Sequence, residues 1–140
     1  MIPYAQSILP AGDVQLLMRI RQALEALPDV DLGVNEEGEE ITLSCHILSR
    51  AVAKVFSLKC RSGFYYPGFS HSWLVTASNN VIDVLPPGIV GGPILADGSP
   101  YSPSIKQYIR RDVRKISDGN FSQPSFRRSV RRIIRELKNK

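Results

Sequence analysis

The hydrophobic pattern of this sequence changes from a helical period to a strand period near Lys59, and this change constrains the fold more than any other feature. Before it, apolar residues recur at spacings of three and four in two segments, 13–27 and 44–56. After it come three short segments rich in aromatic and β-branched residues, 62–66, 71–76 and 80–85, which are typical of strands. Helices followed by consecutive strands predict an α+β fold.

The second helical segment begins at good capping residues and carries a cysteine in its first turn. Thr42 or Ser44 can cap this helix, because a side-chain oxygen at that position accepts a hydrogen bond from a free N–H of the first turn. Cys45 lies seven residues before Val52, so it shares the helix face that is expected to be buried. His46 is rotated by about 100° from Cys45 and is expected to be exposed or to line the edge of a cleft.

The strand segments 71–76 and 80–85 are joined by the turn residues "ASNN", which predicts an antiparallel hairpin. If the turn is centred on 77–80, Trp73 lies opposite Asp83. His71 and Asp83 then become diagonal neighbours on one face, with Cβ atoms about 7 Å apart or less. A slip of one residue in this register would move the two side chains to opposite faces.

The remaining segments are predicted from their cap and turn residues. Asp13 is expected to cap the first helix and Pro28 to end it. The acidic segment 29–40 has two glycines and little apolar content, so we expect an exposed loop. The proline- and glycine-rich segment 86–104 is also expected to be a loop, and the pattern of 105–116 fits either a helix or a strand.

The last segment, about 124–140, predicts a basic helix that starts with Pro124 in its first turn. One face carries an apolar stripe, which consists of Phe126, Val130, Ile133, Ile134 and Leu137. The other face carries arginines, which include Arg127, Arg128, Arg131, Arg132 and Arg135. We expect the helix to pack on its own domain, while its arginines could contact an acidic protein or a nucleic acid. The 140 residues are expected to form a single domain.

Three residues in different predicted elements could form a cysteine catalytic triad. Cys45 at a helix start is suited to be the nucleophile, because free N–H groups and the helix dipole favour a thiolate. His71 could exchange a proton with the sulfur, and Asp83 could orient His71. Each residue alone fits an ordinary structural role as well, since free cysteines are often buried in cores. Their order and placement favour the catalytic interpretation.

Other uses of these side chains are weaker. His46 is adjacent to Cys45 on a helix, where neighbouring side chains do not face each other, so His71 is the better base. A zinc site formed by Cys45, His46 and His71 is disfavoured for the same reason. Cys60 is expected to be a plain structural thiol. No metal site is expected, because no second Cys/His pair with zinc-finger spacing exists. No cofactor is expected, and "GIVGGP" does not match a phosphate-binding loop.

The region from 42 to 87 resembles the transglutaminase-like branch of the papain-like fold, and is nearest in style to the leader peptidases that process lasso peptides. The segments that carry the resemblance are "SCHILSRAVAKVF", "FSHSWLV" and "NVIDVLP". The resemblance implies a cysteine helix packed on a small antiparallel sheet, with Cys45, His71 and Asp83 as a triad. Ser44, His46 and Trp73 are candidates to line the substrate cleft, and Trp73 fits a place in the core or the cleft wall better than one that stacks on a substrate. The stretch before Cys45 lacks the glutamine that papain-like enzymes often use in the oxyanion hole.

These observations lead to two expectations for function. The first is acyl transfer or hydrolysis on a peptide or protein amide, by a peptidase, amidase or deamidase. The second is an inactive papain-like binding module whose arginine-rich helix contacts an acidic partner or nucleic acid. The N-terminus lacks the features of a signal peptide and no apolar run is long enough to span a bilayer, so a cytoplasmic location is expected.

Overall fold

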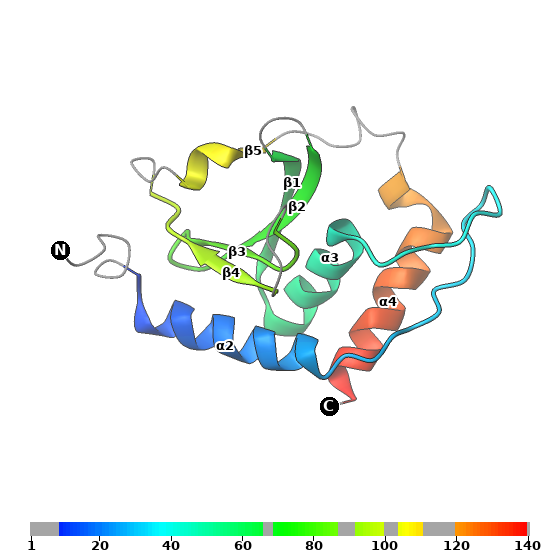
Figure 1. Cartoon of the computed structure of the whole chain (residues 1–140), viewed down its shortest axis with the longest axis horizontal. Helices are drawn as coiled ribbons and strands as arrows, with labels where there is room; N and C mark the ends of the chain where they lie inside the picture. The colour runs from blue at the N-terminus through cyan, green and yellow to red at the C-terminus, as the bar shows by residue number, and fades with distance from the viewer. Residues whose placement is uncertain (1–8, 66–68, 87–91, 100–103, 111–119, 140) are drawn as a thin grey trace.

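The computed structural model describes residues 9–65, 69–86, 92–99, 104–110 and 120–139. In this part of the chain the helices are α2 (Ala11–Glu25), α3 (Cys45–Phe56) and α4 (Pro124–Lys138), with short 3-10 turns η1 (Ser104–Gln107) and η3 (Asn120–Ser122). The strands are β1 (Lys59–Tyr65), β2 (Phe69–Val75), β3 (Val81–Asp83), β4 (Ile94–Ala96) and β5 (Tyr108–Arg110). The predicted α+β class is confirmed (Figure 1).

The five strands form one antiparallel sheet in the order β4-β3-β2-β1-β5, which curls into a half-barrel. The β2–β3 hairpin pairs Leu74 with Ile82 and Val75 with Val81. This is the predicted register, because continuing it by one residue sets Trp73 opposite Asp83. Asn79 closes the turn with a positive φ of 65°, a conformation that asparagine tolerates better than most residues.

The prediction of a plain loop over 86–104 is wrong in one part, because Ile94–Ala96 forms β4 and pairs with β3 at the sheet edge. Three residues between glycines and prolines are too few to show a strand period, so only the neighbouring strand reveals them. Gly98 then passes close to the hairpin turn. A Cβ at this position would lie 1.8 Å from the carbonyl oxygen of Asn79, so the close approach requires glycine.

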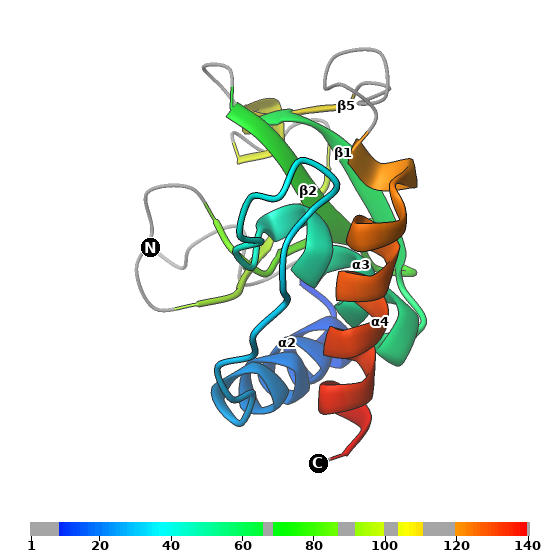
Figure 2. The ribbon, with the colours of Figure 1, turned by 90° about the vertical axis from the view of Figure 1, so that its right-hand side faces the viewer.

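Helix α3 is the centre of the fold, because it lies between the sheet and α4 (Figures 1 and 2). Its start is as predicted, with Ser44 as the cap and the Ser44 hydroxyl accepting the Ile47 N–H at 3.2 Å. Leu48 and Val52 are buried in the core between the two layers. Packing on both sides fixes the direction in which the first turn of α3 points.

Helix α2 packs on the sheet, but its start differs from the prediction. It begins at Ala11 with Pro10 at the cap position, so Asp13 lies inside the first turn and caps nothing. The buried Asp13 carboxylate instead accepts hydrogen bonds from Thr76 Oγ1 at 2.8 Å and Asn80 Nδ2 at 2.9 Å. These partners lie more than 60 residues away, so no local rule could find them.

Helix α4 begins with Pro124 at its first position and packs its apolar stripe on α3, as predicted. Segment 105–116 is partly 3-10 helix and partly strand β5, and its residues 111–116 lie outside the described residues. The N-terminal residues 1–8, where no signal peptide was expected, also lie outside them. Within the described ranges, no helix has the length and hydropathy needed to cross a membrane.

Candidate active site

Cys45 is the first residue of α3, so its side chain lies at the positive end of the helix dipole. The Ser44 hydroxyl is occupied with the cap, which leaves it a structural role at the edge of the site. Cys45 is a free thiol and half-buried, which leaves its sulfur reachable from solvent. A half-buried thiol at a helix N-terminus is a typical setting for a reactive cysteine.

His71 and Asp83 form a buried pair on neighbouring strands. The His71 Nε2 and Asp83 Oδ2 atoms are 2.7 Å apart, and the two residues are 2% and 0% exposed. The second oxygen of Asp83 accepts the Leu85 N–H at 3.2 Å. These contacts hold the carboxylate in place and leave Nδ1 as the ring nitrogen that His71 can direct at another group.

Cys45 lies within hydrogen-bonding reach of His71. Burial by itself would lower the pKa of His71, but hydrogen bonds with Asp83 and Cys45, together with their charges, outweigh burial and raise the pKa to about 9. Because Asp83 occupies Nε2, Nδ1 is the ring nitrogen that is left for Cys45. The structure therefore brings the three predicted residues together as one chain of contacts.

An aromatic cage surrounds His71. The Trp73 ring stacks behind the imidazole at 6.2 Å between centroids, and Tyr65 meets it edge-on at 5.8 Å. Trp73 is 3% exposed, so it forms the wall behind His71 and offers little surface to a substrate. These rings exclude water from the pair and restrict the rotation of the imidazole.

Tyr108 is a member of the site that the sequence did not single out. Its Oη donates a hydrogen bond to Asp83 Oδ2 at 2.9 Å, the same oxygen that binds His71. Burial and the nearby Asp83 charge raise the pKa of Tyr108, so its hydroxyl stays a donor. Tyr108 reaches this position because β5 pairs with β1, and the only sequence signal was an ambiguous apolar alternation.

His46 lies apart from this chain of contacts. It was expected to be exposed or at a cleft edge, but its ring is partly buried against the other face of β2. Its Nδ1 lies 2.6 Å from Ser72 Oγ and its Nε2 lies 3.1 Å from Ser70 Oγ. Burial, with the charges of Arg50 and His71, lowers the pKa of His46 to about 4. Both ring nitrogens are occupied, so His46 is poorly placed to act as a base.

Arg50 is a second residue that sequence patterns did not reveal. Its guanidinium donates to the His46 carbonyl at 3.0 Å, to Ser72 Oγ at 3.1 Å and to Ser62 Oγ at 3.0 Å. It also lies 4.0 Å from the ring centroid of Phe121. No carboxylate of the described residues pairs with it, so this cation contributes positive potential beside the start of α3.

Cys60 is the other free thiol and lies on β1. Burial raises the pKa of Cys60, which keeps it in the unreactive thiol form at neutral pH. Its predicted structural role is consistent with this environment.

A largely apolar groove of about 500 Å³ opens beside the site. Its lining includes Thr42 and Leu43, which precede Cys45, and Val84 and Leu85, which follow Asp83. The rest of its lining comes mainly from α2, the segment that follows it, and the core, and includes Leu24, Leu27, Val30, Ile41, Leu48, Pro93 and Ile133. Leu43 and Leu85 are each 40% exposed and lie within two residues of Cys45 and Asp83 in the sequence, while Cys45, His71 and Asp83 themselves do not line the groove.

No group of three or more His, Cys, Asp or Glu side chains among the described residues is arranged to hold a metal ion. The His46 nitrogens, which a zinc site would need, bind serines instead.

Comparison of the chain with known protein families, with curated proteins and with solved structures finds no match.

Proposed function

We propose that this protein is a cysteine-dependent acyl-transfer enzyme with Cys45 as nucleophile, His71 as general base and then acid, and Asp83 as the residue that orients His71. The observation that carries the proposal is the continuous chain of contacts from Cys45 through His71 to Asp83. The buried Asp83 fixes the imidazole at 2.7 Å, and Cys45 at the helix start takes the remaining nitrogen. This division of roles is the general logic of cysteine and serine triads.

The reaction follows from these positions. With its pKa raised to about 9, His71 already carries the proton at neutral pH, so the Cys45 sulfur forms the bond to the carbonyl carbon beside an imidazolium. The oxyanion is stabilised by the backbone N–H of Cys45 at the positive end of α3. The bond to the leaving nitrogen or oxygen then breaks as His71 returns the proton to it. Water or an amine attacks the thioester, transfers a proton to His71 and releases Cys45.

The substrate class that fits best is a peptide or protein amide with an apolar side chain near the scissile bond. The groove lined by Leu43 and Leu85 supports this, because its volume of about 500 Å³ holds a large apolar side chain with room to spare. The resemblance of 42–87 to the transglutaminase-like branch of the papain-like fold points to the same chemistry. We treat residues 1–140 as one domain that works in a reducing compartment, where both thiols stay free.

Activated esters test the proposal without knowledge of the natural substrate. With p-nitrophenyl acetate, the wild type is expected to release nitrophenolate in a burst of about one equivalent and to carry an acetyl group on Cys45 by mass spectrometry. Cys45→Ala should lose the burst, while Cys60→Ala should keep it. A wild type without acetyl-Cys45, or a burst that survives in Cys45→Ala, would contradict the proposal.

The chain length of the ester tests the groove. A hexanoyl ester should acylate Cys45 on the order of tenfold or more faster than the acetyl ester, because each buried methylene contributes about 0.8 kcal/mol. Leu43→Asp should remove this preference. Val14→Asp is the matched control, since Val14 is a similarly exposed apolar residue of α2 outside the groove. Equal rates with both esters in the wild type would reject the groove as the acyl site and leave the triad untouched.

A binding module without catalysis is the second candidate, and the arginines of α4 favour it. If Cys45 is not acetylated while an anionic ligand binds α4, a role as a binding module fits the protein better than a role as an enzyme.

A further inference from the structure

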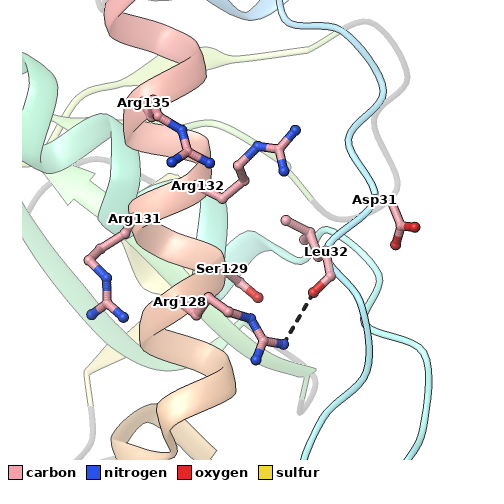
Figure 3. Close-up of a pocket in the computed structure, with 7 residues that line it drawn as sticks. All are labelled: Asp31, Leu32, Arg128, Ser129, Arg131, Arg132 and Arg135. Atoms are coloured by element: carbon pink, nitrogen blue, oxygen red, sulfur yellow. Dashed lines mark hydrogen bonds between the residues drawn. The ribbon is translucent and has the colours of Figure 1, made fainter.

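Four of the arginines on α4 line a pocket of about 320 Å³ between this helix and the segment that leads to α3 (Figure 3). The lining residues are Asp31, Leu32, Arg128, Ser129, Arg131, Arg132 and Arg135. Arg127, which the sequence grouped with the other arginines, does not line it. The structure thus divides the basic face of α4 into a pocket and an outer surface.

The wall opposite α4 is held in place by two sets of contacts. The Arg128 guanidinium donates to the carbonyl of Val34 at 3.0 Å and to that of Leu32 at 3.4 Å, as Figure 3 shows for Leu32. The Glu36 carboxylate accepts hydrogen bonds from the backbone N–H and the hydroxyl of Ser125 at the start of α4. These hydrogen bonds lower the pKa of Glu36. Because both ends of the wall are anchored, the pocket is a fixed feature of the fold.

The positive charge in this pocket is only partly compensated. Arg132 Nε pairs with Glu136 at 3.2 Å. Asp31 is the one carboxylate among the described residues of the lining, and its Oδ1 accepts the Gly33 N–H at 2.9 Å. Arg131 and Arg135 form no hydrogen bond or ion pair with any described residue. The pocket therefore holds two guanidinium groups whose donors are open to a ligand.

The spacing of the arginines brings like charges close together, and a bound anion would reduce their repulsion. The four arginines, at positions 128, 131, 132 and 135, follow the helical repeat. They therefore lie on one side of α4, over a rise of about 10 Å. Two like-charged pairs at i, i+4 arise, and such pairs destabilise a helix. Guanidinium groups bind phosphate oxygens in pairs of parallel hydrogen bonds, so a phosphate group is the ligand that matches this donor set.

The surroundings favour a small ligand over an extended polyanion. The segment 29–40, which forms the opposite wall, carries six carboxylates. A nucleic-acid strand running along α4 would meet this acidic segment, whereas a compact group can sit among the arginines alone. The volume of about 320 Å³ is at the lower end of the range for small-molecule sites. We infer that this pocket binds a small molecule that bears a diphosphate or triphosphate group.

Titration calorimetry with tripolyphosphate tests the inference on the full chain. The wild type should bind one equivalent saturably, and Arg131→Gln/Arg135→Gln should weaken binding about tenfold or more. Arg127→Gln/Lys138→Gln is the matched control, because it removes the same two charges from α4 outside the pocket. This control should bind nearly as the wild type does. Cys45→Ala should also bind normally, since the pocket is independent of the proposed catalysis.

Three outcomes would overturn the inference. The first is the absence of saturable binding at millimolar tripolyphosphate. The second is equal weakening in both double variants, which would indicate diffuse attraction to the basic helix. The third is tighter binding of a single-stranded oligonucleotide than of tripolyphosphate at the same salt concentration, with loss in the outer double variant. That result would assign α4 to nucleic acid.

Discussion

The two histidines of this protein lie close to the start of α3 and have opposite electrostatic environments. His71 faces the Asp83 carboxylate and the Cys45 thiol, and its pKa is raised to about 9. His46 faces two serines and the Arg50 cation, and its pKa is lowered to about 4. His71 is the more deeply buried of the two, and burial alone would lower its pKa, so burial does not explain the difference. The difference comes from the partners, and only His71 has partners that can use a proton.

The comparison shows why sequence adjacency misleads at a helix start. His46 follows Cys45 directly, but the helical turn directs its ring to the serines of β2 on the other face. His71 lies 26 residues away, and the hairpin register brings it beside Asp83 and within reach of the sulfur. Three tests measure how far the environments of His71 and His46 differ.

Removal of the Asp83 carboxylate should have the largest effect. Asp83→Ala leaves the buried His71 and Tyr108 without their acceptor, so unfolding free energy should fall by about 3–5 kcal/mol in urea denaturation. Ser70→Ala removes a partner of His46 at an exposed position. This substitution should change the unfolding free energy by less than about 1 kcal/mol. Equal losses in the two variants would show that the two histidine environments are energetically alike.

The pH dependence of stability should run in opposite directions for the two histidines. The raised pKa of His71 means that the folded state holds an extra proton between the ordinary 6.5 and about 9, so this stabilisation is present below 6.5 and lost as pH rises through 9. The lowered pKa of His46 means that stability falls as pH drops from 6.5 towards 4.

NMR titration of the two imidazoles checks these directions in the folded state. Two midpoints on opposite sides of 6.5 are expected, with the upper one moving down in Asp83→Asn because the negative charge is gone. Midpoints that both lie near 6.5 would contradict the assigned environments.

Loss of the Tyr108 hydroxyl should have a much smaller effect than loss of the Asp83 carboxylate. Tyr108→Phe removes one hydrogen bond to Asp83 and should lower unfolding free energy by about 1 kcal/mol. Tyr65→Phe is the control, since the Tyr65 ring also contacts His71 but does not bind Asp83. If the two variants lose the same stability, Tyr108 acts by packing alone and not by holding the carboxylate.

Local rules predicted the parts of this site that depend on short stretches of chain. The Ser44 cap placed Cys45 at the helix start, and the turn residues 77–80 set the register that pairs His71 with Asp83. Tyr108 and Arg50 could not be predicted, because their partners come from other strands and no periodicity records them.

The same limit explains the errors in the fold. Asp13 looked like a helix cap, but it is held by Thr76 and Asn80 across the fold. Strand β4 has three residues and becomes recognisable only through its pairing with β3. Contacts between distant segments decided both cases, and a single sequence carries no pattern for them.

The rate of Cys45 alkylation by iodoacetamide at pH 7 tests the central claim most directly, with Cys60 as the reference thiol in the same chain. His71→Ala should slow alkylation of Cys45 on the order of tenfold or more, because the sulfur loses its proton acceptor. His46→Asn should change the rate by only a small factor. Slowing of Cys45 by the same factor in both variants, or a wild-type Cys45 that reacts no faster than Cys60, would contradict the assignment of His71 as its partner.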